Sequence, residues 1–177
     1  MVVLQLALNC IYGFDDFNID FTYPKKIVNS FIESENLEGR ERFRYKKAVI
    51  LMGANATGKT SLGKALLRIF NYMANGNPIP LCEMVCGAKG SFSIDFVNGD
   101  NRLQRLTAEI VPNRNEVEIQ YQDAEIGVLD SYEKCVAKLQ DRTAEATQTV
   151  TSLKKLVGEV RCRFAYPEIE KSLKLTK

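Results

Sequence analysis

The sequence predicts an α/β fold, in which a mixed sheet is joined by an antiparallel β-subdomain and a C-terminal helical segment. Three observations predict it. An apolar run at 48–52 precedes a glycine-rich loop and a helical pattern. Three β-like runs, separated by turn signals, lie between residues 91 and 122. From 131 onward, apolar residues recur at helical spacing.

The glycine-rich loop fits a known phosphate-binding pattern. Its residues match G-x-x-x-x-G-K-[ST] at every fixed position, and they read Gly53-Ala54-Asn55-Ala56-Thr57-Gly58-Lys59-Thr60. The apolar run before it is too short for a helix, so we expect a buried strand there. The residues after it place one apolar stripe on a helix, formed by Leu62, Leu66, Ile69 and Met73. This order of strand, loop and helix predicts a P-loop NTPase lobe.

The residue types of the loop suit a nucleoside triphosphate. Gly53 and Gly58 permit backbone angles and close approach that a side chain would block. Lys59 supplies a cation for the phosphates, and the Thr60 hydroxyl is placed to ligate Mg²⁺. We therefore expect ATP with Mg²⁺ as cofactors. The residues expected to bind them are Gly53, Ala54, Asn55, Ala56, Thr57, Gly58, Lys59, Thr60 and Ser61.

Composition limits the function classes. The 177 residues are 45% hydrophobic and 26% charged with a net charge of +2, which is ordinary for a globular domain. The chain shows neither a signal sequence nor an apolar run of membrane-spanning length, so we expect a cytoplasmic protein without membrane contact. Its five cysteines do not suggest a disulfide framework. Because histidine is absent, Ser-His and Cys-His nucleophile pairs are excluded.

The residues before the phosphate loop are expected to form two strands and a polar insertion. Residues 2–9 and 17–21 alternate as strands do, and two strands before the loop argue against a minimal kinase or small GTPase. Residues 24–46 form a polar insertion, with a short amphipathic helix expected near 27–32. The basic residues at 40–47 are diluted by glutamates and fit an exposed loop better than a nucleic-acid contact.

The segments after the first helix divide into two parts. An antiparallel meander is expected over 91–122, which completes a nucleotide-binding lobe at 1–125. Residues 126–177 are expected to form a helical segment. Its apolar positions follow heptad spacing, namely Val136, Leu139, Thr143, Ala146, Val150, Leu153, Val157 and Val160. Two interpretations stay open, a coiled-coil arm or a helix packed on its own domain.

Asp130 is the candidate for a catalytic carboxylate within this chain. It ends the apolar run 126–130, where a self-contained P-loop NTPase can place its Mg²⁺-linked acid. Gly127 weakens that strand, and Ser131 stands where a catalytic glutamate would follow. Asp95 is a poorer candidate, because the run before it alternates.

The phosphate loop resembles that of one family of ATPases. Asn55 at its third position is similar to the G-x-N-x-x-G-K-[ST] loop of ABC-type ATPases of the SMC, RecF and OLD-like group. The AAA-family ATPases of bacterial anti-phage systems are related to them. The two strands and aromatic turn at 2–21, and the meander, also resemble the first lobe of that family. The resemblance spans 1–125 and implies an ATP-binding lobe.

The sequence also departs from that family. It has no Ser-Gly-Gly signature loop, no Asp-Glu pair and no switch histidine, all of which lie in a second lobe of family members. The resemblance therefore implies an ATPase only as part of a larger chain or complex. A second lobe and a homo-oligomeric partner would complete it, with DNA or an effector protein as the target, in DNA maintenance or anti-phage defence. The alternative is an assembly module in which nucleotide binding is structural and residues 132–160 mediate oligomerisation.

Overall fold

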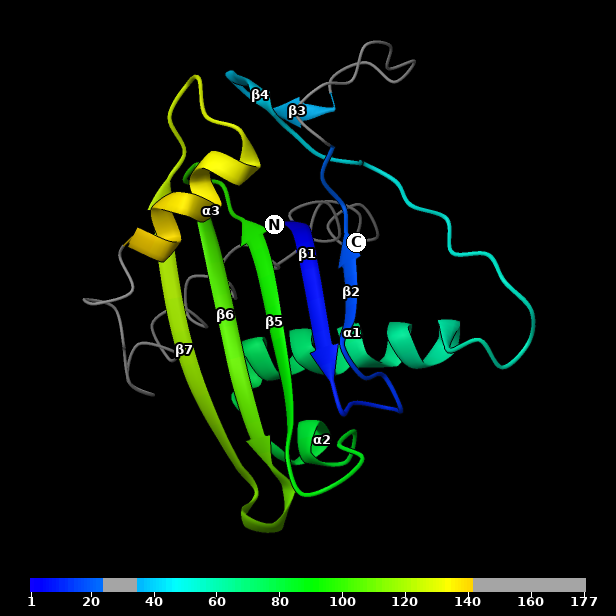
Figure 1. Ribbon diagram of the computed structural model, residues 1–177. Helices are drawn as coiled ribbons and strands as arrows, with labels where there is room; N and C mark the ends of the chain where they lie inside the picture. Colours follow the sequence, from blue (N-terminus) through cyan, green and yellow to red (C-terminus); the bar gives the residue numbers. More distant parts are fainter. Residues whose placement is uncertain (24–34, 142–177) are drawn as a thin grey trace, which may run out of the picture.

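A five-stranded sheet is the centre of the fold. The computed structural model describes residues 1–23 and 35–141, and its main sheet has the order β2-β1-β5-β6-β7 (Figure 1). The strands are β1 (Val2–Asn9), β2 (Phe17–Asp20), β5 (Gly90–Val97), β6 (Arg102–Val111) and β7 (Glu116–Glu125). These strands and helices confirm the α/β class and the predicted meander.

The strand directions correct one prediction. Every strand pair in the described part of the chain is antiparallel, so the expected mixed sheet is wrong. β1 pairs directly with β5, and the meander therefore continues the sheet of the N-terminal strands. The N-terminal strands and the meander share one sheet, and the meander is not a separate β-subdomain.

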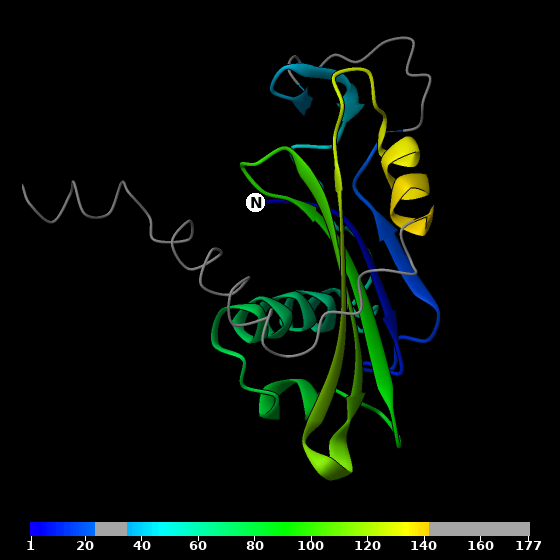
Figure 2. The ribbon, with the colours of Figure 1, turned by 90° about the vertical axis from the view of Figure 1, so that its left-hand side faces the viewer.

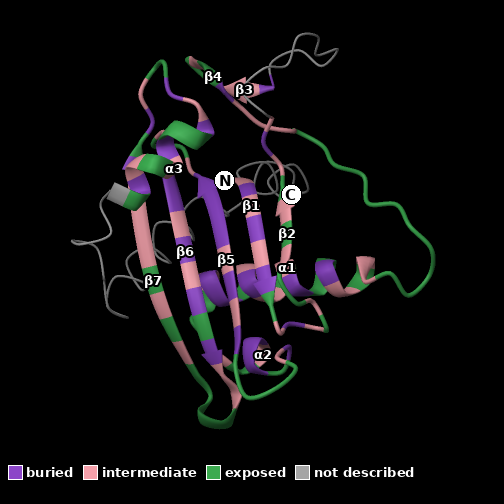
Figure 3. Cartoon of the chain, in the orientation of Figure 1, coloured by how far each residue is buried: buried purple, intermediate pink, exposed green. Residues whose placement is uncertain are grey.

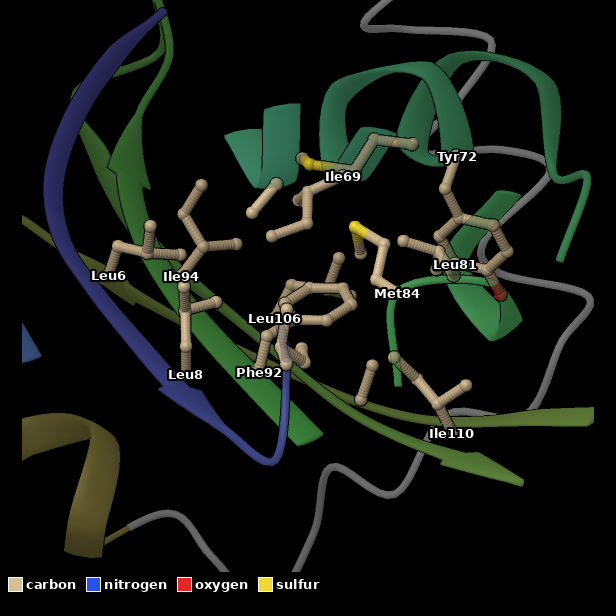
Figure 4. Packing of buried hydrophobic residues seen from close by; sticks show 14 of the residues in the cluster. Leu6, Leu8, Ile69, Tyr72, Leu81, Met84, Phe92, Ile94, Leu106 and Ile110 are labelled. Carbon is tan, nitrogen blue, oxygen red and sulfur yellow. The ribbon is translucent and has the colours of Figure 1, made fainter. Parts of the chain in front are cut away.

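Two helices cover one face of this sheet. α1 (Lys59–Asn75) and α2 (Ile79–Cys82) lie on the same side of it (Figures 1 and 2). The predicted stripe of α1 is confirmed, since Leu62, Ile69 and Met73 are buried and Leu66 packs against the same core. Alternate residues of the strands fill the space below the helices, as Figure 4 shows for Phe92 and Leu106. The start of α1 is thereby fixed relative to the sheet.

A β-bulge in β1 places Leu4 and Leu6 on opposite faces of the sheet. Val3 pairs with Phe96 and Gln5 with Asp95, so Leu4 is an extra residue between them. Leu6 belongs to the cluster under α1, whereas Leu4 belongs to a second cluster. Without the extra residue, strict alternation would place both leucines on the same face.

The second cluster lies under α3 (Tyr132–Asp141), on the face opposite to α1 (Figure 2). Tyr132, Cys135 and Leu139 are buried there, at spacings of three and four. The Tyr132 hydroxyl group lies 2.6 Å from Asp95 Oδ2. The start of the heptad pattern is therefore a packed helix, and the remainder, residues 142–160, lies outside the described residues.

The polar insertion is more structured than predicted. β3 (Asn36–Leu37) and β4 (Arg40–Arg44) form a two-stranded antiparallel sheet. Phe43 is completely buried in the second cluster, so this part of the insertion is not simply solvated. The short helix expected at 27–32 lies outside the described residues.

The apolar run before the phosphate loop does not form the predicted buried strand. Residues 48–52 have no regular secondary structure, and Ile50 and Met52 are 81% and 87% exposed. Figure 3 shows the exposed connection between β4 and α1. No pairing joins this run to a strand in the part of the chain that the structure describes. The sequence preference for a strand was not sufficient, because a strand also needs a neighbour.

None of the described helices combines the length and the apolar character needed to span a membrane.

Candidate functional site

The phosphate loop has the backbone shape that its glycines suggest. Ala56 and Gly58 have positive φ angles of 65° and 86°, in the left-handed region. A Cβ atom on Gly53 would lie 3.0 Å from the Thr57 hydroxyl oxygen, so a side chain there would crowd the loop. Left-handed residues in a turn direct successive N–H groups toward one side, which favours anions. The loop therefore turns tightly at Ala56 and Gly58.

The Lys59 side chain forms hydrogen bonds with the backbone of this loop. Its ε-ammonium group donates to the carbonyl oxygens of Gly53 at 2.7 Å and Ala54 at 2.6 Å. It also lies 3.1 Å from the Thr57 hydroxyl oxygen, and this hydroxyl donates to the Ala54 carbonyl at 2.9 Å. All these partners are neutral, so the positive charge of Lys59 is held in place without being cancelled.

The start of α1 adds backbone donors. Gly58 precedes the helix without any side-chain cap, and the first helical hydrogen bond runs from Leu62 N–H to the Gly58 carbonyl at 2.9 Å. The amides of Lys59, Thr60 and Ser61 have no partner within the helix, as in any first turn. They lie at the positive end of the helix dipole, beside the Lys59 ammonium group. Cation and amides together place positive potential at the start of α1.

The donor set also fits Mg²⁺ with a nucleotide. Thr60 is exposed, and its hydroxyl oxygen is a hard ligand of the kind that Mg²⁺ accepts beside phosphate oxygens. Asn55 is exposed in the same loop. The nine predicted binding residues, 53–61, all lie in this loop and in the first turn of α1.

Phe14 is a neighbour of the loop that the sequence interpretation did not single out. It lies in the turn between β1 and β2, and its ring packs on Phe17 with centroids 4.7 Å apart. A Cβ atom on Gly58 would lie 3.0 Å from the Phe14 ring. Gly58 is therefore required both for its backbone angle and for this close contact. In the sequence, the aromatic residue directly after Gly13 could have indicated this contact.

Asp130 does not belong to this site. The expected strand at 126–130 is wrong, because these residues form a turn that leads into α3, and α3 lies on the sheet face opposite to α1 (Figure 2). The Asp130 carboxylate accepts a hydrogen bond from Gly127 N–H at 2.7 Å and forms ion pairs with Lys134 and Lys138. Hydrogen bonds from these lysines, Lys134 first, hold the pKa of Asp130 well below its usual range. Asp130 is a structural anion.

Asp95 is likewise occupied. It is 2% exposed and accepts two hydrogen bonds from the Arg105 guanidinium, each at 2.7 Å. The same hydrogen bonds raise the pKa of Arg105. Burial raises the pKa of Tyr132, which also contacts this carboxylate. This network attaches α3 to the sheet, so neither carboxylate considered from the sequence serves the phosphate loop.

Comparisons do not supply a family for the chain. No protein-family model matches the sequence, and no curated protein matches it.

Proposed function

We propose that this chain is the ATP-binding lobe of an ABC-type ATPase of the SMC, RecF and OLD-like group, with ATP and Mg²⁺ held by residues 53–61. The observation that carries the proposal is the state of Lys59. Its ammonium group is fixed by the Gly53 and Ala54 carbonyls and is not neutralised by any carboxylate in the described residues. A fixed cation beside free helix amides is preorganised for phosphate.

Different groups of the loop would bind different parts of Mg-ATP. The amides of the loop and of the first helical turn donate to phosphate oxygens, and Lys59 donates to the β- and γ-phosphates. The weakest of its three contacts, with the Thr57 hydroxyl at 3.1 Å, is the one that a phosphate oxygen would replace. Thr60 ligates Mg²⁺ through its hydroxyl oxygen.

A second lobe is proposed because the described site is incomplete. Val49, Ile50, Leu51 and Met52 are exposed next to the phosphate loop, although their side chains favour burial in a sheet. A hollow of about 520 Å³ is lined by Val49 of this segment together with Val2 and Phe21. A partner that pairs with 48–52 would bury these side chains and supply the missing acid. Hydrolysis would then depend on that lobe and on dimerisation.

The biological setting rests on the resemblance of the loop. ATP would close a clamp in the assembled enzyme, and hydrolysis would reopen it. DNA or an attached effector protein is the proposed target, in DNA maintenance or anti-phage defence.

Calorimetric titration with Mg-ATP tests nucleotide binding. We expect Lys59→Ala to lower the affinity by at least about 100-fold, since charge-assisted hydrogen bonds to phosphate are lost. Lys64→Ala is the matched control, because Lys64 is an exposed lysine of the same helix. It should bind like the wild type. Unchanged affinity in Lys59→Ala, with the helix content preserved, would refute the proposed site.

The exposed segment supports a second candidate, an assembly module in which nucleotide is structural. Ile50→Asp separates the two functions. The variant should fold normally, because Ile50 is 81% exposed. If the chain assembles through 48–52 with itself, light scattering will show a wild-type oligomer that Ile50→Asp dissociates. A wild-type monomer that binds Mg-ATP supports the first proposal, an ATP-binding lobe that is completed by a different protein or lobe.

A further inference from the structure

Cys10 and Cys86 lie opposite each other where the end of β1 meets the segment before β5. Ile11 and Val85 form an antiparallel bridge there. One residue further along each segment, an antiparallel register brings Cys10 opposite Cys86. The Cys86 N–H group donates to the Cys10 carbonyl oxygen at 2.9 Å, which confirms that register.

This placement suits a disulfide bond. One backbone hydrogen bond joins the two residues, so their backbones are adjacent, and the left-handed φ of 53° at Cys10 takes that residue out of regular strand geometry. Disulfides join Cα atoms roughly 4.4 to 6.8 Å apart. Both residues are free thiols in the structure. Formation of the bond therefore requires the two side chains to rotate toward each other and the backbone at Cys10 to adjust.

The two thiols have different surroundings. Cys86 is exposed, whereas Cys10 is partly buried. A hydrogen bond to the Asp15 carboxylate raises the pKa of Cys10, and burial and nearby negative charges act in the same direction. Cys10 therefore stays protonated, and Cys86 is the thiol that meets a dissolved oxidant first.

The remaining described thiols are less accessible. Cys82 and Cys135 are buried, and burial raises the pKa of both, that of Cys135 to about 11. Among the described cysteines, Cys86 is the one that is exposed. Its opposed neighbour Cys10 is the one placed to react with it.

We propose that Cys10 and Cys86 form a redox-active dithiol, which a peroxide converts into an intramolecular disulfide and a small thiol reduces again. The Cys86 thiolate attacks the peroxide; an S–O bond forms, the O–O bond breaks, and the leaving oxygen takes a proton as water. The Cys10 sulfur then attacks Cys86; the S–S bond forms, the S–O bond breaks, and a second water carries away the Cys10 proton. Two thiols lose two electrons, and one hydrogen peroxide becomes two waters.

The bond would restrain a turn next to the phosphate loop. Cys10 begins the turn that contains Phe14, and Phe14 packs against Gly58. Joining Cys10 to Cys86 would attach this turn to the start of β5. The chemistry itself does not require nucleotide binding, so it stands or fails separately from the proposed ATPase function. Transient disulfides of this kind are the form that occurs in reducing compartments.

Peptide mapping of the peroxide-treated full chain tests the proposal. Free thiols are alkylated after the treatment, and the digest is analysed by mass spectrometry without reduction. We expect one crosslinked pair of peptides containing Cys10 and Cys86, lighter by two hydrogens and lost on treatment with dithiothreitol. The oxidised chain should also melt about 5 °C higher, because the bond restricts the unfolded chain.

Two variants assign the roles of the thiols. In Cys10→Ser, peroxide should leave a sulfenic acid on Cys86 that dimedone traps, because the second thiol is missing. In Cys86→Ser, Cys10 should be trapped at least about tenfold less. The proposal is overturned if both thiols of the folded wild type are fully alkylated after peroxide treatment, or if Cys10 crosslinks to a different cysteine. The wild-type map decides this even if a variant folds poorly.

Discussion

The starts of α1 and α3 are both turn-to-helix junctions with a lysine nearby, yet they are electrostatically opposite. At α1, Lys59 contacts neutral oxygens of residues 53–57, and no carboxylate of the described residues forms an ion pair with it. At α3, Asp130 is buried and paired with Lys134 and Lys138. The first junction can attract an anion from solution, whereas the second already contains its own.

The difference shows how a binding site can be distinguished from a structural ion pair. Two lysines and one buried carboxylate satisfy each other at α3, so an external ligand would have to displace an existing contact. At α1 the helix amides and Lys59 add positive potential, and they lie in an exposed loop. Substitutions that change one junction and leave the other intact test this distinction.

The largest expected effect concerns hydrolysis. The isolated chain should bind Mg-ATP but turn it over several orders of magnitude below the usual rate of about 1 per second or more, because Asp95 and Asp130, the two candidate carboxylates, are held in ion pairs and do not activate water. A phosphate-release assay measures this, and Asp130→Asn should leave the residual rate unchanged. Turnover near 1 per second that disappears in Asp130→Asn would reverse the assignment of the two junctions.

A second prediction disturbs α3 alone. Asp130→Asn should lower the free energy of unfolding by about 1 to 3 kcal/mol, because Lys134 and Lys138 lose their charged partner. The affinity for Mg-ATP should not change. Urea denaturation at pH 7 measures the first quantity, with Glu133→Gln as a control. Glu133 is an exposed acid in the same first turn, so its variant should stay within about 0.5 kcal/mol of the wild type.

The pH dependence of that effect sharpens the comparison. The pKa of Asp130 is lowered in the folded state, chiefly by Lys134 and then by Lys138. The ion pairs therefore stabilise the fold fully above the ordinary aspartate pKa of about 4, and the contribution is lost as the pH falls through the lower folded pKa. The gap between wild type and Asp130→Asn in urea should be largest near pH 7 and shrink below about pH 4. A gap that grows in acid would contradict this origin.

Local patterns explain which parts of the molecule were predictable. The alternation of Phe92, Ile94 and Phe96 identified β5 because the side-chain period of a strand is fixed by its own backbone. The stripe of α1 follows from helical spacing in the same way. The tight backbone of the loop at 53–58 depends on glycines that are close together in the sequence, and its binding of phosphate stays a prediction.

The parts that failed depend on distant partners. Burial of 48–52 requires a neighbouring strand, and apolar character alone cannot indicate whether one is present. Asp130 was taken for the end of a strand, because the preceding residues are apolar. Its spacing of four to Lys134 and eight to Lys138 was a helical signal for an ion pair, once α3 is known to begin at Tyr132. The contact of Phe14 with Gly58 joins segments far apart in the sequence.

The smallest effect comes from a matched pair of glycines at the start of α1. Gly58 has a φ of 86° and would bring a Cβ atom to 3.0 Å from Phe14, whereas a Cβ atom on Gly63 meets open space. Gly58→Ala should therefore lower the free energy of unfolding by about 1 to 2 kcal/mol and weaken Mg-ATP binding. Gly63→Ala should raise that free energy by about 0.5 to 1 kcal/mol, because alanine favours the helix, and binding should not change. Both are measured by urea denaturation and calorimetric titration. Equal effects of the two substitutions would mean that the left-handed geometry of the phosphate loop contributes nothing to either property.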